Sequence, residues 1–277
     1  MQALSVFVRV CACLVLVVVG VPVAAAQPPA PDPLARASQL YNSGDYDAAV
    51  TAAREVSARP GAPPEARLLL GRALLERHRA SRMAEDLTGA RSALVAVDAT
   101  ALSDRARLDL VIGLGEALYL DGQYRPAALL LEPVLEQMGL LSPVAREQVV
   151  DWWGTAMDRY AQTRPPEQRG SIYDEISARL RSHLARYPDS SAAAYWLPAA
   201  ALARGDLELA WDLALTGWVR STLAADHGVA LRTDLDRLMT QAIIPERVKR
   251  LADEPDAAAA AARFASEWDE AKGRWRR

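Results

Sequence analysis

The stretch from Leu108 to Glu136 constrains the fold more strongly than any other part of this sequence. Its apolar and small side chains recur at steps of three and four residues, which is the spacing of one face of an α-helix. The period stops at Gly122 and resumes at Tyr124, so the stretch predicts two amphipathic helices joined by a tight turn. Each helix can bury its apolar face only by folding back on the other. The sequence therefore predicts a helical hairpin.

Three predicted turns share one signature, in which glycine is followed by Asp or Gln and then by a large residue. They are Gly44-Asp45-Tyr46, Gly122-Gln123-Tyr124 and Gly205-Asp206-Leu207, and each is followed three residues later by alanine (Ala49, Ala127, Ala210). Between them lie two less regular hairpins, marked by Leu70-Gly71 and Trp153-Gly154. We expect expanded turns in these two hairpins, at residues 77–85 and 162–173, which brings the mean repeat to about 40 residues.

This pattern resembles the tetratricopeptide repeat family. The resemblance rests on Leu114-Gly115 in the first helix of the central hairpin, on Gly-x-Tyr at its turn, and on the alanine that follows. It implies an all-α fold, a right-handed superhelical solenoid of about five helix–turn–helix hairpins over residues 34–220. A solenoid needs its exposed end covered, and residues 221–277 are expected to form C-terminal helices that cap it.

Two regions depart from the repeat pattern. Pro198 stands where the first helix of the fifth hairpin should carry its small residue, and it should kink that helix unless the packing accommodates it. In the tail we expect short helices split at Pro245 and a last helix that ends at Trp275. Phe264, Trp268 and Trp275 fall on one face of this last helix, which suits docking on the fifth hairpin. The alternative is a helix that lies on a membrane surface.

Residues 1–26 have the order of a bacterial secretory signal peptide. Arg9 precedes an apolar run, and Ala24-Ala25-Ala26 supplies small residues for a cleavage site. We expect cleavage near Ala26 and a periplasmic or extracellular protein, whereas a retained leader would act as a signal anchor. Cys11 and Cys13 lie at the start of the apolar run, where a lipid-modified cysteine is not expected, and cleavage would remove both. Residues 27–33 are predicted to form a proline-rich tether.

Sequence motifs of catalysis are absent. The chain has no nucleophile elbow, phosphate loop or H-E-x-x-H zinc motif, and we expect neither an enzyme nor a bound cofactor or metal. The three histidines, His78, His183 and His227, are expected at the surface or in turns. The formal net charge is −3 and both signs are interspersed, so nucleic acid is not an expected partner.

The family resemblance also implies where a partner binds. In tetratricopeptide proteins the inner groove is lined by the face of each first helix that points away from the second helix. Carrying this face across gives a predicted partner-binding groove of Tyr41, Asn42, Arg72, Glu76, Asp109, Glu116, Tyr119, Asp151, Asp158, Arg159 and Tyr195. Acids outnumber arginines in this set, which favours a basic or amide-rich partner. Trp152 is expected to pack between repeats rather than to stand exposed as an anchor.

The sequence therefore predicts an exported scaffold that binds a protein or peptide partner in the solenoid groove. No stable membrane insertion is expected after the leader is removed. A structural subunit of a cell-envelope assembly is the first alternative, and it should show large apolar patches on the outer face. A ligand-binding protein or enzyme that uses the two expanded turns as site walls is a weaker alternative.

Overall fold

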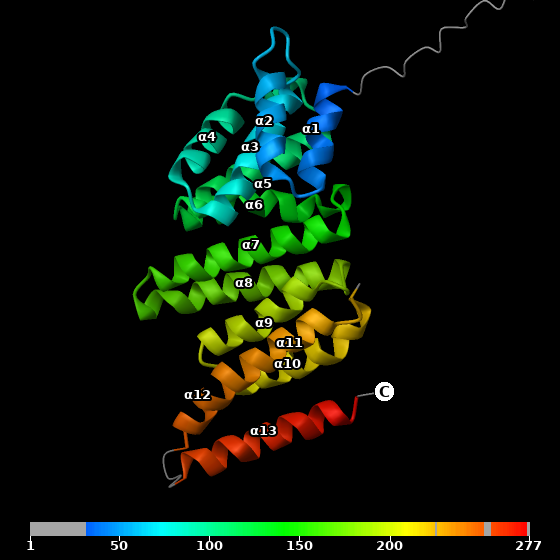
Figure 1. The fold of residues 1–277 in the computed structure, drawn as a ribbon. Coiled ribbons are helices and arrows are strands. Elements are labelled where there is room, and N and C mark those ends of the chain that lie inside the picture. The colour runs from blue at the N-terminus through cyan, green and yellow to red at the C-terminus, as the bar shows by residue number, and fades with distance from the viewer. Residues whose placement is uncertain (1–31, 225, 252–255, 276–277) are drawn as a thin grey trace, which may run out of the picture. The chain divides into compact units, whose positions relative to one another are not determined.

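The computed structural model describes residues 32–224, 226–251 and 256–275, and all the regular elements in these ranges are helices (Figure 1). The α-helices are α1 (Pro33–Asn42), α2 (Tyr46–Ser57), α3 (Pro64–Ser81), α4 (Ala84–Val95), α5 (Asp104–Leu120), α6 (Tyr124–Glu136), α7 (Pro143–Gln162), α8 (Pro166–Arg186), α9 (Ser191–Ala203), α10 (Leu207–Arg220), α11 (Val229–Leu238), α12 (Ile244–Lys249) and α13 (Ala257–Gly273). The all-α prediction is confirmed. The predicted leader and residues 27–31 of the predicted tether lie outside the described residues, while Pro33 opens α1.

Helices from α1 to α11 pack in chain order. Each odd-numbered helix contacts the helix that follows it and also the next odd-numbered helix, so α3 contacts α4 and α5, and α7 contacts α8 and α9. The first helices of the hairpins, α1, α3, α5, α7 and α9, therefore lie side by side with α11 (Figure 1). Buried leucine, valine and alanine side chains fill the space between each first helix and its second helix.

The three predicted turns form as expected. Gly44, Gly122 and Gly205 have φ angles of 81°, 75° and 80°, a left-handed conformation that glycine adopts at no steric cost. Asp45 and Asp206 then cap α2 and α10, because each carboxylate accepts a hydrogen bond from a backbone N–H three residues later, at 3.2 Å and 3.1 Å. Local chemistry therefore ends one helix and starts the next.

Small residues permit close helix contacts, as predicted for the central hairpin. A Cβ atom on Gly115 of α5 would lie 2.7 Å from the Leu131 side chain of α6, and one on Gly71 of α3 would lie 2.5 Å from Leu94 of α4. Gly154 differs, because its open side faces Trp196 of α9 at 2.8 Å instead of its own hairpin partner α8. The third small residue therefore serves the contact between two hairpins.

The prediction of expanded turns at 77–85 and 162–173 is wrong. α3 continues to Ser81 and only two residues precede α4, while α7 ends at Gln162 and α8 begins at Pro166. The extra residues lengthen the helices instead. Arg82 ends α3 in a left-handed conformation with a φ of 60°, and Pro166 is tolerated in the first turn of α8, where its missing N–H has no partner to lose.

Helix α9 passes through Pro198 without interruption. Proline has no N–H to donate to the carbonyl four residues earlier, which belongs to Ala194. This carbonyl lies against Gly217 of α10, where an added Cβ would be 3.1 Å from the oxygen. Gly217 therefore lets α10 pack closely against the turn of α9 in which the proline removes a hydrogen bond.

The C-terminal helices differ in two ways from their prediction. A π-helical turn, Met239–Ile243, joins α11 to α12, so Pro245 does not split the chain into separate helices. In α13, Phe264 and Trp268 are buried, but Trp275 is 57% exposed and does not belong to the docked face. Helix α13 contacts α10 and α12, and Trp268 and Lys272 donate to the Asp236 carboxylate of α11 at 2.7 Å each.

Candidate functional site

A small cavity of about 50 Å³ lies where the first helices α1, α3, α5 and α7 meet. The predicted groove residues that line it are Tyr41, Arg72, Glu76, Asp109 and Glu116. Arg105 of α5 and Gln148 and Trp152 of α7 complete its polar and aromatic lining. Residues that are more than a hundred positions apart in the chain therefore converge because the first helices stack side by side.

Arg72 joins three of these helices at one end of the cavity. Its guanidinium lies over the Tyr41 ring of α1, 5.1 Å from the centroid, and 3.6 Å from the Asp109 carboxylate of α5. Arg105 approaches the same carboxylate at 3.3 Å. Burial raises the pKa of the Tyr41 hydroxyl above its ordinary value, so this ring presents a neutral face to Arg72.

Arg79 makes the corresponding contacts at the other end. Its guanidinium lies 3.0 Å from Glu76 on its own helix, 2.8 Å from Glu116 of α5, and 4.5 Å from the centroid of the Trp152 ring of α7. The spacing is regular: Arg79 follows Arg72 by two helical turns on α3, as Glu116 follows Asp109 on α5. The predicted set omitted Arg79, although this seven-residue spacing in the sequence could have indicated it.

Glu116 is not the solvent-exposed groove residue that the sequence suggested. It is 6% exposed, and burial raises its pKa to about 7, against the lowering effect of Arg79. The neighbouring Glu76 raises this pKa further. Among the described residues, its Oε1 atom has the Arg79 ion pair but no well-aligned hydrogen bond. The ion pair with Arg79, and not a directed hydrogen bond, therefore holds this oxygen of the carboxylate.

Trp152 packs between repeats, as predicted. Its side chain is partly buried among the residues of the central core. Its ring stacks against the Arg79 guanidinium of α3, although α5 comes between α3 and α7 in the order of first helices. The same ring lines the cavity, so its role in packing and its place in the site coincide.

The remaining predicted acids lie on α7. Asp151 accepts a hydrogen bond from the Trp196 indole of α9 at 3.0 Å, and Asp158 accepts one from the Tyr173 hydroxyl of α8 at 2.9 Å. Burial raises the pKa of Tyr195, and the nearby carboxylates of Asp151 and Asp158 raise it further. Asp151, Asp158 and Tyr195 therefore form a second cluster, which continues the first-helix face from α7 to α9.

Three further predicted residues lie neither in the cavity lining nor in this second cluster. Asn42 is exposed at the end of α1, and Arg159 is exposed on α7. Tyr119 instead packs beside Tyr124 at the turn of the central hairpin, with ring centroids 5.7 Å apart. This contact repeats the Tyr41–Tyr46 pair at the first hairpin turn, at 5.8 Å.

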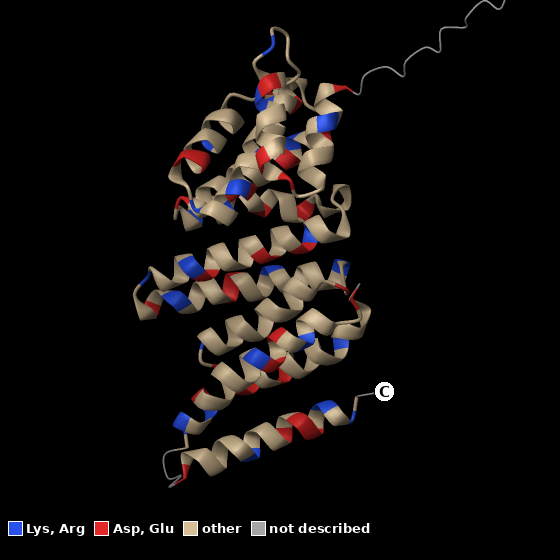
Figure 2. Cartoon of the chain, viewed as in Figure 1, with Lys and Arg blue, Asp and Glu red and all other residues tan. Residues whose placement is uncertain are grey.

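Arginines balance the acids of the cavity. Arg79 pairs with Glu76 and Glu116, while Arg72 and Arg105 pair with Asp109. The predicted groove set contained more acids than arginines because it left out Arg79 and Arg105. The cavity itself has no such excess of acids. Figure 2 shows the same interspersion of both signs along the described helices.

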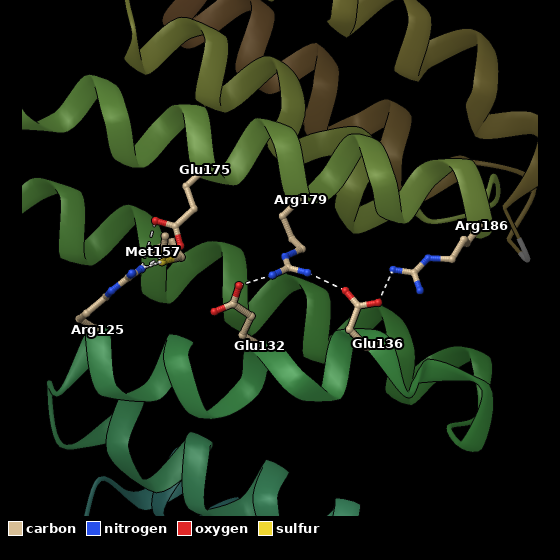
Figure 3. A network of polar contacts seen from close by, with 7 residues as sticks. All are labelled: Arg125, Glu132, Glu136, Met157, Glu175, Arg179 and Arg186. Atoms are coloured by element: carbon tan, nitrogen blue, oxygen red, sulfur yellow. Dashed lines mark hydrogen bonds and ion pairs between the residues drawn. The ribbon is translucent and has the colours of Figure 1, made fainter.

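Second helices are joined by a ladder of ion pairs of their own (Figure 3). Arg179 of α8 bridges Glu132 and Glu136 of α6, and Arg186 approaches Glu136 at 2.9 Å. Arg125 of α6 reaches Glu175 of α8 at 3.1 Å. These side chains are partly exposed, so each ion pair is expected to contribute little to stability.

The histidines are more buried than the sequence suggested. His78 is buried, with Nδ1 2.8 Å from the Met83 carbonyl, and His183 is 2% exposed with neither ring nitrogen hydrogen-bonded within the described chain. Only His227 is an exposed turn residue, as expected. The prediction is wrong for the first two because both lie on the buried faces of α3 and α8.

In the described parts of the chain, His, Cys, Asp and Glu side chains do not gather in groups of three that could hold a metal ion. None of the described helices combines the length and apolar character needed to cross a membrane.

No protein-family model matches the chain, and no curated protein matches it. The tetratricopeptide resemblance therefore stays a prediction from the residues quoted above.

Proposed function

We propose that this protein is an exported scaffold of the tetratricopeptide type, a right-handed solenoid that binds a protein or peptide partner along its first helices. One observation carries the proposal: side chains from α1, α3, α5 and α7 converge on a single cavity. Polar and aromatic side chains of adjacent first helices form the kind of surface that an extended segment can follow from one hairpin to the next.

The two ends of this surface suit different contacts. The cavity itself is small and its charges are paired, so it accepts the tip of one partner side chain. The surface around Tyr195 carries the carboxylates of Asp151 and Asp158, whereas Asp234 of α11 is paired with Arg237 at 2.9 Å. A basic or amide-rich stretch of the partner therefore fits best across α7 and α9.

Export is proposed from the predicted leader. Cleavage after Ala26 would place the small residues Ala26 and Ala24 one and three positions before the cut. N-terminal sequencing of the protein from a bacterial envelope fraction tests this part. We expect the mature chain to begin at Gln27. An intact Met1 in the membrane fraction would instead establish a signal anchor.

Site-directed photo-crosslinking tests the binding surface. A photoreactive amino acid replaces Gln148 or Arg105, which are exposed and line the cavity, and the matched controls replace Thr51 of α2 and Ala178 of α8, which are exposed on second helices. We expect a crosslinked partner from the first two positions only. Equal yield from all four positions would remove the first-helix surface from the function.

A structural subunit is the second candidate, because apolar side chains do stay exposed away from the first helices. Leu223 and Trp275 are 56% and 57% exposed. Chemical crosslinking of the mature protein in the intact envelope separates the candidates, since a subunit should be recovered in one stable complex. The alternative of a ligand-binding protein or enzyme used expanded turns at 77–85 and 162–173 as site walls, and these residues are mostly helical.

A further inference from the structure

Two neighbouring hollows form an apolar groove across the second helices α8 and α10. The first, of about 550 Å³, lies between the end of α10 and Trp275, and the second, of about 330 Å³, lies between α8, α9 and α10. Thr216 and Arg220 line both hollows, so the two adjoin at these side chains. We call this surface the α8–α10 groove. It shares no lining residue with the first-helix cavity.

Large apolar side chains form the floor and walls of the groove. Leu215, Val219, Leu223 and Trp275 line the first hollow. Leu184, Leu197 and Leu213 line the second. More than half of the Leu223 and Trp275 surface is open to water, which leaves apolar area that a ligand would stabilise by covering.

The charge of the groove has one sign. Arg220 lies where the hollows meet and Arg181 lines the second hollow, whereas no acidic side chain lines either hollow within the described chain. Arg220 donates one hydrogen bond, to the Pro188 carbonyl at 3.3 Å. A guanidinium has five N–H donors, so Arg220 keeps donors for a second, anionic acceptor.

These features fit a chain that is apolar along its length and anionic at one end. The neutral polar side chains along the described groove are Thr216 and Thr222, and the Thr222 hydroxyl already donates to the Val219 carbonyl at 3.2 Å. An extended peptide would turn some of its backbone groups toward this surface, which offers them few polar partners, and an unpaired backbone group costs free energy once water is excluded from it. An acyl chain has no such groups. The two hollows also have volumes typical of sites for small ligands.

We propose that the α8–α10 groove binds a long-chain carboxylate, such as a fatty acid. The acyl chain lies against the leucines of the two hollows and the carboxylate pairs with Arg220. This function goes beyond partner binding on the first helices and uses different residues.

Calorimetric titration of the mature protein with monomeric dodecanoate tests the proposal. We expect saturable binding of one dodecanoate, and binding about tenfold weaker for dodecanol and for Arg220→Met, because each removes one half of a charge-assisted pair. Thr216→Trp should abolish binding, since this side chain is exposed and would fill the junction of the hollows.

Matched controls keep the result interpretable. Arg54→Met and Thr51→Trp make the same changes on the exposed face of α2 and should bind dodecanoate as the wild type does. Circular dichroism melting should show all four variants folded. Absence of saturable binding, or binding that survives Thr216→Trp, would overturn the proposal. So would binding only to anionic vesicles, or to an acidic amphipathic peptide that dodecanoate does not displace.

Discussion

Glu116 and His183 are buried ionisable side chains whose protonation affects stability in opposite directions. Burial raises the pKa of Glu116 to about 7 from an ordinary 4.5, so between these values the folded chain binds the proton more tightly than the unfolded chain. Burial lowers the pKa of His183 to about 4 from an ordinary 6.5, so between these values the unfolded chain binds the proton more tightly. The Glu116 contribution to the free energy of unfolding is therefore lost as pH rises, and the His183 contribution is lost as pH falls.

Replacing Glu116 with Gln isolates the first effect. Gln keeps the size of the side chain and cannot ionise, so the variant should gain stability over the wild type as pH rises from 5 to 8. The gain should reach at most about 3 kcal/mol, from 1.36 kcal/mol per pKa unit. Urea unfolding at the two pH values measures it. The control Glu55→Gln, on an exposed side chain of α2, should stay within about 0.5 kcal/mol of the wild type at both.

Replacing His183 with Leu isolates the second effect. The ring packs beside Tyr187, with centroids 4.9 Å apart, and its nitrogens have no hydrogen-bond partner among the described residues, so an apolar side chain can take its place. Burial is the main cause of the lowered His183 pKa, and the nearby charges of Arg186 and Arg146 lower it further. The carboxylates of Asp189 and Glu136 raise this pKa in part. Between pH 6.5 and 4 the variant should lose less free energy of unfolding than the wild type. An equal loss would mean that His183 does not contribute to acid sensitivity.

At the scale of one hairpin, the contact between Gly115 and Leu131 is the most direct test of helix packing. Gly115→Leu places a side chain where even a Cβ would lie 2.7 Å from Leu131, and should lower the free energy of unfolding by about 1–3 kcal/mol. Gly170 of α8 is the matched control. An added Cβ there meets nothing within 4 Å, so Gly170→Ala should stabilise the chain by up to about 1 kcal/mol through helix propensity. Equal effects in thermal melts would show that close packing at Gly115 is unimportant.

Some elements of the fold were predictable from the sequence and others were not, for physical reasons. Hairpin turns were predictable because Gly122 and the capping aspartates act on their own neighbours. Helix lengths were not, since no glycine or proline between Arg77 and Ser81 marks where α3 ends. His78 is buried on α3, and its Nδ1 atom lies 2.8 Å from the Met83 carbonyl just past the end of the helix. Pro245 was misread because it lies in the first turn of α12, where a missing N–H is tolerated, and a π-helical turn before it keeps the chain helical.

Across the molecule, the tetratricopeptide resemblance predicted part of the first-helix face that lines the cavity. Alignment of the first helices found Tyr41, Arg72 and Glu76, which do meet in the cavity. It could not find that Arg79 would cover Trp152, because this contact joins α3 to α7 and depends on how closely the first helices stack. Charge pairing across helices, and with it the net charge of a groove, is therefore a property of the assembled fold.

The last prediction concerns the acidic cluster around Tyr195 and its partner. The double variant Asp151→Asn, Asp158→Asn removes two charges but keeps an acceptor for the Trp196 indole and for the Tyr173 hydroxyl, so the fold should be unchanged. If the partner is basic there, its association with the variant should slow severalfold and depend less on salt, since the Debye length falls from about 10 Å at 0.1 M to about 3 Å at 1 M.

Stopped-flow association with the partner captured through Gln148 measures this at several salt concentrations. The matched control, Glu55→Gln with Glu85→Gln, removes two exposed charges from second helices and should associate as the wild type does. Because both double variants lower the net negative charge by the same amount, a difference between them reports local steering around Tyr195. Equal association of the two would assign the partner's contact to the paired charges of the cavity, where long-range steering is weak.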